Sequence, residues 1–99
     1  MVHLEKEEEF NNLVKEGTVL VDFFATWCGP CKLLGPVLED LEKEEEGLKI
    51  IKIDVDKCEN LAREHGVMSI PTIEVYKDGK MVNKSLGFHN KNQLKDLIK

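Results

Sequence analysis

Two cysteines separated by two residues are the chemically most informative feature of this chain. Cys28 and Cys31 stand in the hexapeptide WCGPCK (27–32), after an apolar run and before apolar residues at helical spacing. This context places the pair at a turn from a strand to the start of a helix, where free N–H groups and the helix dipole favour a negative charge. Because the thiolate is the reactive form of cysteine, the spacing predicts an activated Cys28 and a second thiol one turn away that can close a disulfide.

The same two thiols could instead supply half of a zinc site. Zinc usually has four ligands, and the other candidates in the chain are Cys58, His65, His3 and His89. None of these forms a second close pair of the usual spacing, so the sequence favours thiol–disulfide chemistry over zinc binding. The total of three cysteines is odd and does not indicate a structural disulfide framework.

Composition and charge exclude several classes of function. The 99 residues are 41% hydrophobic and 33% charged, which is typical of one globular domain spanning 1–99. The net charge of −5 argues against nucleic acid as a partner, because phosphate binding needs clustered positive charge. The sequence has no apolar run long enough to cross a membrane and no signal-peptide core, so we expect a cytoplasmic protein without a membrane partner. In a reducing compartment a close cysteine pair is more often catalytic or metal-binding than structural.

The elements that must position the cysteines follow from hydrophobic periodicity and turn residues. Together they predict an α/β fold in the order β-α-β-α-β-α-β-β-α, with a mixed central sheet flanked by helices. Three strands are expected to be parallel, and a hairpin closes the sheet at Asp78-Gly79. The predicted strands are 1–4, 18–25, 48–55, 72–76 and 81–86. The predicted helices are 6–16, 31–46, 59–65 and 93–99.

Asp22 is a carboxylate inside the apolar run 19–24 that precedes the cysteines. Apolar neighbours on both sides indicate burial, which raises the pKa of a carboxylate. A pKa near neutrality suits a proton acceptor, so Asp22 is a candidate for acid–base chemistry. From the residues alone, a strand-end aspartate that makes a structural hydrogen bond explains the same pattern equally well.

The hexapeptide and its setting resemble the thioredoxin family, and the resemblance extends over nearly the whole chain. It implies the thioredoxin fold and a thiol–disulfide oxidoreductase that reduces protein disulfides. In that reaction the Cys28 thiolate attacks a disulfide, and Cys31 then resolves the mixed disulfide. The resemblance further implies that Asp22 lies beneath Cys31 and accepts its proton through water, while Lys52 on the next central strand tunes Asp22. A lysine whose stem packs while its amine reaches solvent is the alternative explanation for Lys52.

The resemblance also implies a substrate groove beside the cysteines. In this family the proline at Pro71 follows a cis bond and faces the cysteines, and the residue before it, Ile70, offers main-chain hydrogen bonds to an extended substrate segment. An apolar rim completes the groove. Its implied members are Trp27, Gly29, Pro30, Met68, Gly87 and Phe88. Core packing is the alternative explanation for Trp27 and Phe88.

By the same resemblance, the protein uses no metal or organic cofactor beyond the Cys28–Cys31 disulfide. Thioredoxin reductase is the implied electron donor, disulfide-containing client proteins are the implied substrates, and the protein is expected to act as a monomer. A thioredoxin-like binding module that works without redox chemistry is the alternative function.

Several positions differ from those of other family members. Phe24 stands where many members have a tryptophan, and Met68-Ser69 stands where an arginine–glycine pair can occur. Cys58 matches a cysteine of animal thioredoxins, but the position of its usual partner is occupied by His65. We therefore expect these differences to affect the choice of partner rather than the chemistry, and Cys58 to be structural or incidental.

Overall fold

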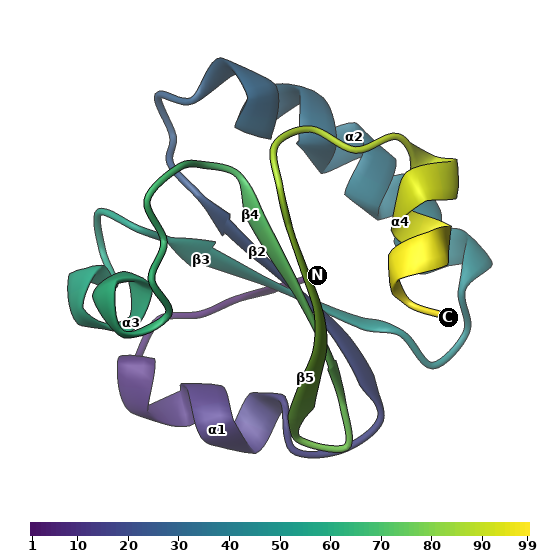
Figure 1. The fold of residues 1–99 in the computed structure, drawn as a ribbon, viewed down its shortest axis with the longest axis horizontal. Coiled ribbons are helices and arrows are strands. Elements are labelled where there is room, and N and C mark those ends of the chain that lie inside the picture. The colour runs from purple at the N-terminus through teal and green to yellow at the C-terminus, as the bar shows by residue number, and fades with distance from the viewer.

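The computed structural model describes residues 1–99 as a five-stranded mixed sheet with helices on both faces (Figure 1). The strands are β1 (Val2–His3), β2 (Thr18–Phe24), β3 (Lys49–Asp54), β4 (Thr72–Lys77) and β5 (Lys80–Leu86). The helical elements are the 3₁₀ turn η1 (Glu7–Glu9), α1 (Phe10–Leu13), α2 (Gly29–Glu44), α3 (Glu59–Glu64) and α4 (Lys91–Leu97). The predicted order of strands and helices is confirmed. None of the helices combines the length and the apolarity that crossing a membrane requires.

β2 occupies the middle of the sheet, whose strand order is β1-β3-β2-β4-β5. β1, β3 and β2 run parallel, whereas β4 is antiparallel to β2 and β5 is antiparallel to β4. This arrangement agrees with three parallel strands and one closing hairpin. In this register Asp22 pairs with Lys52 of β3 on one side and with Ile73 of β4 on the other.

Two hydrophobic cores lie on opposite faces of the sheet. Alternate residues of β2 point to opposite faces, so Val21 and Phe23 join the core beneath α1 and α3. Leu20 joins the other core, which α2 and α4 cover with Leu34, Leu38, Leu41 and Leu94. Figure 1 shows these two helix pairs on either side of the sheet. Because both faces of β2 are covered, the residues from 19 to 23 have no exposed surface.

The first helix is shorter than the predicted range 6–16. It consists of η1 followed by a single turn of α1 that ends at Leu13. The charged first turn has no side-chain cap, and the chain must then turn toward the β4–β5 hairpin. Gly17 makes this connection with a positive φ of 73°, and its N–H donates to Oδ1 of Asp78 at 2.9 Å. Tertiary contacts of the turn therefore end the helix before Gly17.

The last helix begins earlier than predicted because Asn90 caps it. The Asn90 side chain accepts from the Gln93 N–H, and the Gln93 side chain accepts from the Asn90 N–H, both at 2.9 Å. This reciprocal arrangement is a capping box, which satisfies two N–H groups at a helix start. The predicted hairpin turn is confirmed, since Asp78 and Gly79 alone connect β4 to β5 and both have positive φ.

Candidate active site

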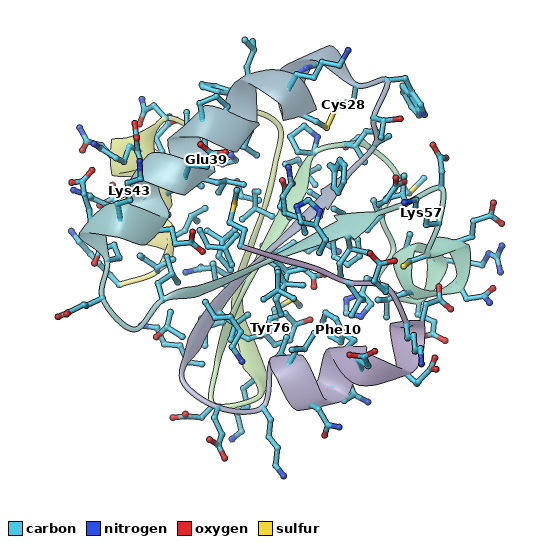
Figure 2. The ribbon with its side chains drawn as sticks, turned by 180° about the vertical axis from the view of Figure 1, so that it is seen from behind. Phe10, Cys28, Glu39, Lys43, Lys57 and Tyr76 are labelled. Atoms are coloured by element: carbon cyan, nitrogen blue, oxygen red, sulfur yellow. A yellow bond between two sulfur atoms is a disulfide. The ribbon has the colours of Figure 1, made fainter.

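Cys28 and Cys31 form a disulfide at the start of α2, with their Cα atoms 5.3 Å apart. Cys28 is the N-cap residue of the helix, and Pro30 lies in the first turn, where a missing N–H costs nothing. Figure 2 shows Cys28 at this end of α2, with the disulfide under the helix start. The helix therefore begins two residues earlier than the predicted 31, and the whole motif lies in its first turn.

The helix start directs an N–H group at the first sulfur. Cys28 Sγ accepts from the Cys31 N–H at 3.3 Å, and Cys28 Sγ also lies 3.8 Å from the carbonyl oxygen of Ile70. Both cysteines are largely buried, with 5% of Cys28 and 3% of Cys31 exposed. An N–H donor and the positive helix end stabilise a thiolate at Cys28 once the disulfide is reduced.

Asp22 lies in β2 on the face that α2 covers. The alternation that points Leu20 into the core beneath α2 puts Asp22 on the same face. The carboxyl group has no exposed surface, and neither of its oxygens has a hydrogen-bond partner in the protein. Burial raises the pKa of Asp22 to about 6, and the positive charge of Lys52 offsets part of that rise. The structural hydrogen bond that the sequence left open for Asp22 is therefore absent.

Lys52 is the register partner of Asp22 on β3, but its amine is not bonded to the carboxylate. Lys52 Nζ lies over the ring of Phe24, 4.4 Å from the ring centre, in a cation–π contact. The amine thus acts on Asp22 through space.

Pro71 follows α3, and the residue before it, Ile70, contacts the cysteines. The Ile70–Pro71 bond is cis, as the resemblance implies. Ile70 packs against the small cluster of Ala25, Cys28 and Cys31. The N–H of Gly87, which has a positive φ of 86°, donates to the Pro71 carbonyl at 2.8 Å. The structure thus places the half-buried Ile70 beside the cysteines, and a main-chain hydrogen bond links the buried Pro71 to Gly87.

The expected apolar rim is largely exposed. Trp27 is 68% exposed and Met68 is 97% exposed, and Gly29, Pro30 and Phe88 are also exposed. Core packing therefore does not account for Trp27 or Phe88. One contact of this rim was not predicted from the sequence: Asp56 Oδ2 accepts a hydrogen bond from the Trp27 indole N–H at 2.8 Å. A turn at Asp54 presents it, because the Asp56 N–H bonds to Asp54 Oδ1.

The surface around the cysteines is open rather than hollow. The structure has three cavities of about 380, 290 and 300 Å³, and neither cysteine lines any of them. Small-molecule sites are normally concave and enclosed, whereas partner proteins dock on open surfaces with exposed apolar side chains. The site is therefore an open surface with exposed apolar side chains rather than an enclosed cavity.

The remaining zinc candidates lie apart from one another. Cys58 is buried in the core beneath α1 and α3, and burial together with the nearby carboxylate of Glu7 raises the pKa of its thiol. His65 contacts Glu74, and His89 contacts Ser85. The structure brings together no group of three histidine, cysteine or acidic residues that could hold a metal ion.

Comparisons with known proteins agree with this geometry. The model of the family described as Thioredoxin matches residues 1–99. The thioredoxin of Bacillus subtilis is 50% identical over 93 residues, covering 93% of this chain and 89% of that protein. The thioredoxin of Chlamydia trachomatis is 46% identical over 98 residues, covering 99% and 96%.

Solved structures give the same picture. Mitochondrial thioredoxin 3 from Saccharomyces cerevisiae, in its oxidized form, superposes with a TM-score of 0.90 at 35% identity and covers 98% of this chain and 92% of that chain. Plasmodium falciparum thioredoxin has a TM-score of 0.90 at 37% identity, covering 99% and 96%.

The fold and the cysteine pair define the class of protein: it is a thiol–disulfide oxidoreductase whose redox group is its own disulfide. Within that class, the chain belongs to the thioredoxin family. The predicted fold and the predicted activity are confirmed, and the binding module without redox chemistry is not favoured.

Proposed function

We propose that this protein reduces disulfides of client proteins through a nucleophilic Cys28 and a resolving Cys31. The observation that carries the proposal is the position of Cys28 as N-cap of α2, with the Cys31 N–H at 3.3 Å from its sulfur. Cys31 lies inside the first turn, whereas Cys28 precedes the helix as its N-cap. An attacking thiol must be reachable by a client disulfide, and the order along the helix supports Cys28 for that role.

The reaction balances over two exchange steps. The Cys28 thiolate attacks one sulfur of the client disulfide, the client S–S bond breaks, and the other client sulfur leaves as a thiolate that takes up a proton. The Cys31 thiol then gives its proton to the Asp22 carboxylate and attacks the Cys28 sulfur. The mixed disulfide breaks, the second client thiolate leaves, and the Cys28–Cys31 disulfide holds the oxidising equivalents.

Asp22 suits the role of proton acceptor because it is buried, unpaired and has a pKa raised to about 6. A base with a pKa close to the working pH combines a deprotonated resting form with useful basicity. Lys52 tunes Asp22 electrostatically, since its charge lowers the pKa that burial raises.

The surface beside Cys28 would hold an extended client segment. The exposed side chains of Trp27, Met68 and Phe88 supply apolar contact, and the main chain at Ile70 supplies hydrogen bonds in the manner of an added strand. The backbone at Gly29, Pro30, Pro71 and Gly87 would permit a close approach. The proposed electron donor is thioredoxin reductase. The proposed functional unit is a single domain over 1–99, which works as a cytoplasmic monomer and needs no further cofactor.

Reduction of insulin disulfides by dithiothreitol tests the proposal. Wild type should accelerate the reaction strongly, Cys28→Ser should be inactive, and Cys31→Ser should accumulate mixed disulfides. The matched control is Cys58→Ser, which removes the one cysteine outside the motif and should keep full activity. Activity in Cys28→Ser, or no acceleration by wild type, would contradict the proposed roles.

A further inference from the structure

Phe24 makes a contact that the catalytic roles above do not use. It ends β2, half-buried, and its ring packs against the cluster that contains both cysteines. The amine of Lys52 lies 4.4 Å from the centre of this ring, within the range of a cation–π interaction. His3 meets the same ring edge-on, with ring centres 6.5 Å apart. The aromatic ring of Phe24 therefore contacts the charged amine of Lys52.

The same amine has a second possible partner in Asp22. Asp22 and Lys52 are register partners on parallel strands, and neighbouring strands lie about 5 Å apart. Both side chains point toward α2, since Leu20 and Ile50, two positions earlier on each strand, belong to the core beneath that helix. Yet neither oxygen of Asp22 has a hydrogen-bond partner. The Lys52 amine is thus close enough to pair with the Asp22 carboxylate, which has no other partner, but it lies over the Phe24 ring instead.

Lys52 is the one charged group that acts on Asp22. On the other side of β2, Asp22 is in register with the apolar Ile73 of β4, and α2 supplies apolar residues such as Leu34 to the core on the same face of the sheet. Lys52 itself lines a cavity of about 300 Å³. The charged or titratable groups that line this cavity with it are His3, Glu5, Asp54 and Lys57.

We propose that Phe24 is a positioning residue: its ring holds the Lys52 amine away from Asp22 and so keeps the carboxylate unpaired as the acceptor of the Cys31 proton. The inference rests on the proposed role of Asp22. It assigns a function to the aromatic side chain at the end of β2, because phenylalanine and tryptophan both offer a ring face to a cation.

Removal of the ring should change the basicity of Asp22. In Phe24→Leu the position stays apolar but the cation–π partner is gone, so the amine is free to pair with the carboxylate. An opposite charge within about 4–6 Å lowers the pKa of a carboxylate by about 1–3 units. The pH midpoint of the resolving step should then fall by about one unit or more, and its plateau rate should drop severalfold because the paired carboxylate is a weaker base.

The experiment follows the two thiol-exchange steps separately. Each reduced protein is mixed with dithiobis(nitrobenzoate), and release of the coloured thiol is recorded by stopped flow between pH 5 and 9. The first release depends on reagent concentration and reports attack by Cys28, whereas the second does not and reports attack by Cys31. The variants are Phe24→Leu, Phe24→Trp as the matched control that keeps a ring, Lys52→Met, the double variant Phe24→Leu/Lys52→Met, and Asp22→Asn.

The proposal predicts that Phe24→Trp keeps the wild-type midpoint for the second release, whereas Phe24→Leu shifts it to lower pH. Combining Phe24→Leu with Lys52→Met should add no shift to that of Lys52→Met alone. A wild-type midpoint in Phe24→Leu would overturn the proposal. So would a shift that persists without the lysine, because it would show that the ring acts by shielding Asp22 from solvent.

Two further readouts separate the possible failures. An unchanged second release in Asp22→Asn would refute the proposed role of Asp22 itself, whatever Phe24 does. The second readout is the proton NMR spectrum of the wild-type protein, which requires no variant to fold. In it, the ring current of Phe24 should shift the ε-methylene protons of Lys52 upfield. Resonances at ordinary lysine positions would overturn the proposal even if Phe24→Leu failed to fold.

Discussion

Replacement of Asp22 by asparagine should stabilise the folded protein at neutral pH. The side chain is fully buried and unpaired, and burial raises its pKa to about 6, whereas an aspartate in an unfolded chain has a pKa of about 4. Between these values the folded state keeps the proton that the unfolded state has lost. The free energy of unfolding therefore falls as the pH rises from about 4 to about 6, and it stays lowered above that range.

The size of the effect follows from the shift in pKa. A difference of about two units corresponds to about 3 kcal/mol, which is the stability that wild type loses between about pH 4 and pH 7.5. Asp22→Asn keeps the shape of the protonated acid and has no charge to bury, so it should avoid this loss. The amide must still be buried without a partner, which reduces the expected gain at pH 7.5 to about 1–3 kcal/mol.

Urea denaturation of the oxidised proteins, followed by far-UV circular dichroism from pH 4 to pH 8, measures the effect. The difference between variant and wild type isolates Asp22, because every other titrating group is shared. Asp40→Asn makes the same change at an exposed position of α2 and is the control for loss of a carboxylate that is not buried. If Asp22→Asn is no more stable than wild type at pH 7.5, or if the difference is the same at pH 4, Asp22 is not a destabilised buried acid.

Four further outcomes are expected. Attack by Cys31 on the mixed disulfide should slow by about tenfold for each pH unit below about pH 6, because Asp22 must be deprotonated to accept the proton; a flat stopped-flow profile in this range would exclude that role. Tyr76→Phe should lower the free energy of unfolding by about 1–3 kcal/mol in urea titrations while insulin reduction stays normal, because the Tyr76 hydroxyl donates to the buried Glu74 at 2.8 Å; an unchanged stability would argue against this bond. Asn90→Ala should cost about 0.5–2 kcal/mol through loss of the cap of α4, and thermal unfolding with no change in midpoint would contradict the capping box. Leu38→Ala should cost about 2–5 kcal/mol, because its side chain is fully buried beneath α2; a cost below about 1 kcal/mol in urea would contradict that packing.

The central strand and the helix that carries the cysteines could be predicted because their signals are local. β2 is apolar on both faces, and the residues after Cys31 repeat at helical spacing. The burial of Asp22 follows from the same run, since a residue between Val21 and Phe23 in a covered strand cannot reach solvent. The chemistry of the site was therefore visible in a short stretch of sequence.

The ends of the helices were predicted less accurately than their existence, because tertiary contacts determine where a helix begins and ends. The first helix ends at Leu13 since Gly17 must join the hairpin at Asp78. The start of α4 does have a local signal in the sequence, because asparagine at 90 followed three residues later by glutamine is the pattern of a capping box.

Side-chain partners that come from distant segments could not be read from the sequence. To predict the contact of Lys52 with the Phe24 ring, one must know the register between β2 and β3. The buried Glu74 accepts a hydrogen bond from the Tyr76 hydroxyl in its own strand. Its Oε1 also lies 2.9 Å from Nδ1 of His65, which follows α3. Such contacts depend on how helices dock on the sheet, which periodicity does not specify.

Mass spectrometry of the trapped intermediate tests the central account most directly. Reduced Cys31→Ser is mixed with a peptide that contains one disulfide, the reaction is quenched with acid, and the adduct is located by proteolysis. The account predicts a stoichiometric mixed disulfide at Cys28 that dithiothreitol releases, and no adduct in Cys28→Ser/Cys31→Ser. An adduct located on Cys58, or none at all, would contradict the assignment of Cys28 as the nucleophile.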